Sequence, residues 1–270
     1  MKSAVTISLV PEARGGPFVF WDDLAQGCAH AAELGFDAVE IFPPSLDVLT
    51  VAGVKGLLGR HGLQLAAIGT GAGWVKHKLR FTDPDATIRK KAIEFAAGIV
   101  RLAGELGAPA IIGSMQGRYD GIPREQAIGW LAEALESLAE LAGHHDQNLL
   151  FEPLNRYETN VFNLQAEAAT FAGSLKARNV RILCDLFHMN IEEISLATTL
   201  RQLGPMVGHV HWADSNRRAM GLGHTDPAPI VTALRENGYT GYISAEVFPW
   251  PDSVSAARQS LASYRRAFGF

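Results

Sequence analysis

The sequence has little cysteine and no long hydrophobic run, and each absence excludes a class of protein. Its two cysteines, Cys28 and Cys184, lie far apart. Neither a disulfide framework nor a cysteine-based zinc site is therefore expected. The most apolar stretch, residues 95–113, is interrupted by Arg101 and Glu105. It is thus unsuited to span a membrane, which takes about 18 or more consecutive apolar residues.

A large excess of charge of one sign is also missing. Lys and Arg total 24 and Asp and Glu total 28, for a net charge of −4. This balance argues against a broad surface for nucleic acid or anionic membrane, so neither is an expected partner. Residues 1–8 lack the apolar core and cleavage pattern of a signal peptide. We therefore expect a soluble protein of the reducing cytoplasm, and its hydrophobic content of 47% predicts a folded core.

One pattern recurs along the chain. A stretch with helical periodicity ends in a glycine, and a short apolar or β-branched run follows within a few residues. This happens at Gly35, Gly62, Gly107 and Gly238. Glycine suits the left-handed position that follows a helix C-terminus, and the chain then enters a strand. The pattern predicts alternating helices and strands joined by short loops.

This alternation predicts a (β/α)₈ TIM barrel, a fold that typically takes about 250 residues. Eight strands are expected near 4–8, 38–42, 65–69, 110–113, 148–152, 180–185, 207–212 and 242–246. Eight helices are expected near 21–34, 50–60, 86–106, 124–143, 165–175, 195–203, 227–237 and 253–267, the third starting at a signal in Asp83-Pro84. No linker is visible, so a single domain is predicted over residues 1–270. The alternative, a doubly wound open sheet, would place a glycine-rich phosphate turn after the first strand, and residues 9–16 do not match one.

Four consecutive predicted strands end in residues that bind metals. Glu152, Asp185, His211 and Glu246 follow one another at intervals of roughly one strand–helix unit. The carboxyl ends of barrel strands form the active-site face. Three carboxylates and one imidazole suit a divalent cation such as Mn²⁺, Mg²⁺ or Co²⁺ better than structural zinc. The competing interpretation is that each acid is a strand-end cap or the partner of an ion pair.

Further polar residues lie near this predicted site. Glu158, His188 and Arg217 follow the ligand positions in loops and could bind the hydroxyl and carbonyl groups of a polar substrate. They could also be solvated loop residues. His209 is an alternative ligand on the same strand as His211, although its deeper position favours a core histidine. Glu40 ends the second predicted strand and is a further candidate for the rim.

The segments around these positions resemble a known family. Residues 152–158, 185–193 and 208–217 are similar to the D-tagatose 3-epimerase family, and the motif Phe-His-Met-Asn-Ile-Glu-Glu at 187–193 is specific. This family belongs to the xylose-isomerase-like TIM barrels, which include many proteins named sugar phosphate isomerase/epimerase. The resemblance covers most of the chain.

The resemblance implies roles for individual residues. Glu152, Asp185, His211 and Glu246 would hold one divalent ion, usually Mn²⁺ or Co²⁺, and Glu152 and Glu246 would also be the catalytic acid/base pair. Glu158, His188 and Arg217 would contact the substrate near its carbonyl end. Dimers and tetramers are common in the family, so a homo-oligomer is expected.

Two loops differ from the enzymes that act on free ketoses. Residues 66–73 and 112–118 are closer to a branch that includes a 5-keto-L-gluconate epimerase. Arg118 is predicted to bind the far end of the substrate, because a guanidinium suits a carboxylate or phosphate. An acidic keto-sugar would then be preferred over a neutral one. The alternative is that Arg118 is solvated or pairs with Asp120.

The sequence thus predicts a metal-dependent epimerase acting on a keto-sugar or keto-sugar acid. One glutamate would remove a proton next to the carbonyl and the other would return it to the opposite face, through an enediolate stabilised by the cation. An aldose–ketose isomerase of sugars or sugar phosphates could use the same site. An endonuclease of the AP endonuclease IV type would need more histidines and a basic groove. A sugar-binding or metal-binding module without activity is the remaining alternative.

Overall fold

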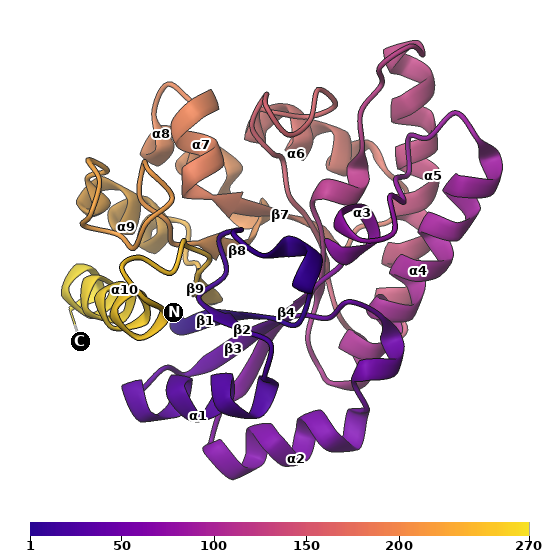
Figure 1. Cartoon of the computed structure of the whole chain (residues 1–270). Helices are drawn as coiled ribbons and strands as arrows, with labels where there is room; N and C mark the ends of the chain where they lie inside the picture. The colour runs from indigo at the N-terminus through magenta and orange to yellow at the C-terminus, as the bar shows by residue number, and fades with distance from the viewer. Residues whose placement is uncertain (270) are drawn as a thin grey trace.

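The structure, a computed structural model that describes residues 1–269, is a closed parallel β-barrel surrounded by helices (Figure 1). Its eight barrel strands are β1 (Lys2–Ser8), β3 (Ala38–Phe42), β4 (Gln64–Gly69), β5 (Ala110–Ile112), β6 (Leu149–Phe151), β7 (Val180–Asp185), β8 (Val207–His211) and β9 (Tyr242–Ala245). Because β1 pairs in parallel with both β3 and β9, the sheet closes on itself. The predicted TIM barrel is confirmed, and the open sheet is excluded. The predicted domain extent includes residue 270, which lies outside the described residues, and stays a prediction.

The helices alternate with the strands as predicted. They include α1 (Leu24–Leu34), α2 (Val51–His61), α4 (Ala86–Glu105), α5 (Arg124–Gly143), α6 (Gln165–Ser174), α8 (Leu196–Leu203), α9 (Pro227–Glu236) and α10 (Ser253–Phe268). Gly35 and Gly62 adopt left-handed conformations directly after α1 and α2, as the recurring pattern required. The predicted start of α4 near residue 86 is confirmed, but its cap is Asp85 and not the Asp83-Pro84 signal, because the Asp85 carboxylate accepts the N–H of Thr87.

The prediction of eight strands and eight helices missed short elements. The described residues also form β2 (Phe20–Trp21), α3 (Ala72–Val75) and α7 (Leu186–Glu192), in the connections after β1, β4 and β7. Three-residue 3₁₀ helices cover 11–13, 46–48, 114–116 and 204–206. Segments this short complete too few turns to show a hydrophobic period. The connections at the carboxyl ends of the strands are therefore more structured than the sequence indicated.

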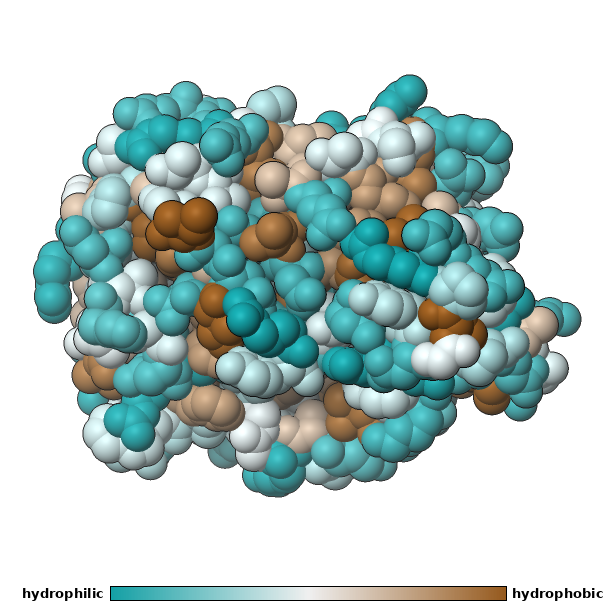
Figure 2. Space-filling model, turned by 90° about the horizontal axis from the view of Figure 1, so that it is seen from above, coloured by the Kyte–Doolittle hydropathy of each residue, from teal (hydrophilic) through white to brown (hydrophobic). Residues whose placement is uncertain are grey.

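The surface and the interior differ sharply in polarity. On the face in Figure 2, hydrophilic side chains predominate and hydrophobic ones form small separate patches. Within residues 1–269, none of the helices combines the length and apolar character needed to cross a membrane. A few polar side chains are nevertheless fully buried in the barrel, among them Glu40, Asp185, His209 and His211. Buried polar groups need partners, so these residues mark the site.

Candidate active site

Four buried side chains from consecutive strands converge at the carboxyl end of the barrel. Glu152 follows β6, Asp185 ends β7, His211 ends β8 and Glu246 follows β9. His211 Nδ1 lies 3.5 Å from one oxygen of each of the three carboxylates, and the four candidate ligand atoms lie within 4.8 Å of one another. Gly113 makes room for this cluster, because a Cβ there would lie 2.4 Å from Glu152 Oε2.

The cluster fits a divalent cation. Among the described residues, His211 Nδ1 and Asp185 Oδ2 are buried and have no hydrogen-bond partner. Distances of 3.5 Å are too long for good hydrogen bonds. Burial above all, together with the charges of Glu246 and Asp185, raises the pKa of Glu152 to about 7, although His211 opposes the shift. A cation bound by the four side chains of the cluster would satisfy the unpaired atoms and offset the repulsion between the carboxylates.

A buried carboxylate behind the cluster orients His211. Glu40 Oε1 lies 3.1 Å from His211 Nε2, and Glu40 Oε2 lies 2.8 Å from His209 Nε2. Burial alone would raise the pKa of Glu40, but the two imidazoles hold it well below its usual value. Burial opposes it, but the surrounding carboxylates raise the pKa of His211 well above its usual value. With Glu40 as the acceptor at Nε2, a cation in the cluster would take the place of the proton on Nδ1. His209 is therefore a core histidine, not the alternative ligand, and Glu40 lies behind the site instead of at its rim.

Asp185 serves two structural purposes at once. Its Oδ1 accepts the backbone N–H of Phe187 at 2.7 Å and so caps α7. Its Oδ2 is the oxygen that faces His211 Nδ1. The helix cap thus fixes the side chain with one oxygen directed at the cluster. The sequence does not predict this role, because α7 is too short to show a hydrophobic period.

Glu158, His188 and Arg217 lie beside the cluster and line the same cavity. Arg217 Nη2 donates to Glu246 Oε2 at 2.9 Å, and its Nη1 donates to Glu158 Oε1 at 3.3 Å. His188 Nδ1 accepts the backbone N–H of Asn155 at 3.2 Å. Burial first, and the charge of Arg217 next, lower the pKa of His188 to about 4. This imidazole is therefore neutral near pH 7, and the donor Arg217 Nη2 lies 3.3 Å from its Nε2.

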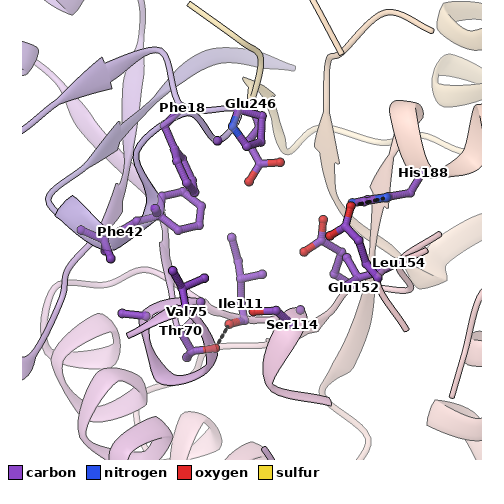
Figure 3. Close-up of a pocket in the computed structure, with 18 of the residues that line it drawn as sticks. Phe18, Phe42, Thr70, Val75, Ile111, Ser114, Glu152, Leu154, His188 and Glu246 are labelled. Carbon is purple, nitrogen blue, oxygen red and sulfur yellow. Dashed lines mark hydrogen bonds and ion pairs between the residues drawn. The ribbon is translucent and has the colours of Figure 1, made fainter. Parts of the chain in front are cut away.

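The cavity of about 210 Å³ has two chemically different ends (Figure 3). Glu152, His188 and Glu246 lie at one end, which we call the polar end. The opposite wall, the apolar end, is formed by Phe18, Phe42, Val75 and Ile111. The hydroxyl of Thr70 at this wall already donates to the carbonyl oxygen of Ile111 at 2.7 Å. A cavity of this volume suits a small ligand, since drug-sized ligands occupy about 300–1,000 Å³.

The predicted role of Arg118 at the far end of the substrate stays a prediction, and the contacts of this side chain favour its alternative interpretation. Its Nε donates to Asp120 Oδ2 at 2.7 Å, and it is absent from the described residues that line the cavity. This ion pair is the contact with Asp120 that the alternative interpretation of Arg118 expects. Lys76, on the neighbouring loop, lies 3.8 Å from Glu12.

Comparison with known proteins places these observations in a family. Residues 28–266 match the model of the xylose isomerase-like TIM barrel family. The chain is 31% identical to the D-psicose 3-epimerase of Agrobacterium fabrum over 244 residues, which are 87% of this chain and 80% of that one. It is 33% identical to the D-psicose 3-epimerase of Enterocloster bolteae over 250 residues, 86% of this chain and 80% of that one.

Two further proteins are similar to this chain: a relative named for a different reaction, and a protein of known crystal structure. The 3-dehydro-D-guloside 4-epimerase of Escherichia coli is 29% identical over 91% of this chain and 95% of its own. The crystal structure of a D-allulose 3-epimerase from Methylomonas superposes with a TM-score of 0.84 at 26% identity, covering 99% of each chain. The chain therefore belongs to the xylose isomerase-like TIM barrel family, and it is an enzyme homologous to the ketose 3-epimerases.

Proposed function

We propose that this protein is a metal-dependent epimerase that inverts the carbinol carbon next to the carbonyl group of a keto-sugar. The observation that carries the proposal is the meeting of Glu152 and Glu246, from β6 and β9, around His211 Nδ1 in a cavity large enough for a small sugar. Glu152, Asp185, His211 and Glu246 would hold the cation, Mn²⁺ in our proposal, with Co²⁺ or Mg²⁺ as substitutes.

The two glutamates supply the proton chemistry. A C–H group next to a carbonyl is a weak acid, and a bound divalent cation supplies positive charge that stabilises the anion formed from it. One glutamate removes the proton and the other returns a proton to the opposite face, which inverts the carbon. Both carboxylates point into the cavity (Figure 3), as this pair of steps requires.

Three neighbouring side chains would orient the substrate. His188 is neutral and lines the cavity beside the cluster, where its ring can contact the substrate. Arg217 holds Glu246 through a charge-assisted hydrogen bond of 2.9 Å. Glu158 accepts hydrogen bonds from Arg217 and from the side chain of Asn155, and its remaining lone pairs can accept from a sugar hydroxyl.

The apolar end favours a neutral substrate over an acidic one. Among the described residues that line the cavity, the positively charged side chain is Arg217. It lies at the polar end and is already paired with Glu246. A carboxylate placed against the rings of Phe18 and Phe42 would lose hydration without gaining a charged partner. We therefore propose a neutral keto-sugar, and not the keto-sugar acid of the 5-keto-L-gluconate branch. The cytoplasmic location and the dimeric or tetrameric assembly stay predictions.

The decisive experiment is a screen of keto-sugars and keto-sugar acids in deuterated water, with and without added Mn²⁺. We expect Mn²⁺-dependent conversion of a neutral ketose to its epimer, with deuterium at the inverted carbon. An aldose product would identify an isomerase instead, and the absence of both product and exchange would contradict the proposal. Arg118→Met is the matched control, and its turnover should equal that of the wild type.

A further inference from the structure

The connection between β8 and α9 holds Arg217 in an uncommon backbone conformation. Arg217 has a φ of 59°, in the left-handed region that non-glycine residues rarely occupy. Its guanidinium is nevertheless well placed, with a side chain 11% exposed and hydrogen bonds to Glu246 and Glu158. Surrounding contacts must therefore compensate for this backbone conformation.

Those contacts converge on Asp214, three residues before Arg217. Asp214 is fully buried. Its Oδ1 accepts the backbone N–H groups of Ser215 at 2.7 Å and Thr225 at 3.0 Å. Its Oδ2 accepts those of Gly221 at 2.7 Å and Gly223 at 2.9 Å. One carboxylate thus ties the beginning of the connection to its end.

Backbone hydrogen bonds link this anchor to Arg217. The N–H of Arg217 donates to the carbonyl oxygen of Asp214 at 2.8 Å. The N–H of Asp214 donates to the carbonyl oxygen of Arg218 at 2.9 Å. The packing around the carboxylate is tight, because a Cβ at Gly223 would lie 2.3 Å from Asp214 Oδ1. The position of Arg217 is therefore coupled to that of the Asp214 carboxylate.

We infer that Asp214 is a positioning residue that holds the Arg217 guanidinium against Glu246 and Glu158. Asp214 does not line the cavity as described, so it acts through Arg217 and not on the substrate. The consequence for turnover rests on the proposed function, whereas the placement of Arg217 can be tested without it.

The first test is a double-mutant cycle with Asp214→Asn and Arg217→Met. Asparagine keeps the size but replaces one acceptor oxygen with an NH₂ group that faces backbone N–H donors. We expect Asp214→Asn to lower kcat/KM at least tenfold in the wild-type background and less than twofold in the Arg217→Met background. An equal loss in both backgrounds would show that Asp214 acts independently of Arg217 and would overturn the inference.

The matched control is Asp226→Asn. Asp226 lies in the same connection and accepts the backbone N–H of Ala228 as the cap of α9, and asparagine caps helices about as well as aspartate. We expect it to leave kcat/KM unchanged. If Asp214→Asn does not fold, Gly223→Ala replaces it in the cycle, since its Cβ displaces the same carboxylate, and additive losses would again overturn the inference.

The second test needs no activity. Arg217 Nε is buried, and burial should slow the exchange of its N–H with water. The signal is observed in a ¹⁵N spectrum and assigned by its loss in Arg217→Met. We expect Asp214→Asn to speed this exchange at least tenfold and Asp226→Asn to leave it unchanged. Unchanged exchange in Asp214→Asn would overturn the inference. A wild type that epimerises no keto-sugar would overturn the proposed function alone.

Discussion

The two ends of the cavity are built from different halves of the chain and by different forces. The polar end consists of side chains at the ends of β6 to β9, held at defined atom-to-atom distances by hydrogen bonds and charge. The apolar end comes from β1 to β5 and their connections, and its rings touch by packing, with the centroids of Phe18 and Phe42 4.5 Å apart. Gly69 permits this wall, because a Cβ there would lie 2.2 Å from the Phe42 ring.

From this difference we expect the polar end to carry the reaction and the apolar end to select the substrate. Electrostatic arrangements depend strongly on the positions of single atoms, whereas apolar burial depends on area and shape. Changes at the polar end should therefore affect turnover and metal binding by large factors. Changes at the apolar end should alter the choice of substrate by smaller ones. The following experiments test this division, beginning with the largest expected effect.

Removing either proposed base should nearly abolish turnover. We expect Glu152→Gln and Glu246→Gln each to lower kcat by about 10³-fold or more, because proton transfer by a positioned group contributes roughly 10²–10⁴-fold. Steady-state kinetics should show KM changing by less than about tenfold. Glu167→Gln, at a surface pair with Arg124, is the control and should behave as the wild type. Near-normal epimerisation by either variant would contradict the assignment of two bases.

Asp185 allows metal binding and helix capping to be separated. Asp185→Asn should weaken Mn²⁺ binding at least about 100-fold in equilibrium dialysis, because it removes the charge of one ligand but keeps an oxygen to cap α7. Asp185→Ala should lose the cap as well, which lowers the free energy of unfolding by about 1 kcal/mol more. Thermal unfolding without metal measures that difference. Unchanged Mn²⁺ affinity in Asp185→Asn would argue against the metal site.

Glu40 extends the polar end behind the candidate ligands. In Glu40→Gln the amide cannot accept from both histidines, so His211 would lose its fixed orientation and tautomer. We expect Mn²⁺ affinity to fall about 10–100-fold, as for other partners of metal-binding histidines. Dialysis measures this without substrate. An affinity within twofold of the wild type would show that packing alone orients His211.

The smallest effect is expected at the apolar end. Val75→Thr keeps the side-chain shape and adds a hydroxyl to this wall. We expect it to shift the ratio of kcat/KM between a ketose and its terminally deoxygenated analogue about threefold to tenfold toward the hydroxylated sugar, an effect of about 1 kcal/mol. Mn²⁺ affinity should not change. A loss of metal binding here would contradict the separation of the two ends.

Much of the barrel and of the candidate ligand set could be predicted without coordinates. A glycine after four of the helices, each followed by an apolar run, defines strand–helix units, and parallel closure brings the carboxyl ends of the strands to one face. The meeting of Glu152, Asp185, His211 and Glu246 then follows from position along the chain, because each stands at the end of its own strand. Local pattern and chain order were sufficient for this part.

Other features depended on the closure of the barrel and on the course of its loops. Glu40 meets His209 across 169 residues of sequence, and this contact exists because the barrel closes. Arg118 paired with Asp120 because the course of its loop, which no periodicity encodes, placed that carboxylate nearer than the cavity. The hydrogen bonds of Asp214 and the apolar wall likewise arise in connections too short or irregular for a hydrophobic period. The order of the strands follows from local sequence patterns. The partner of a loop side chain, in contrast, is decided only when all the loops are packed together.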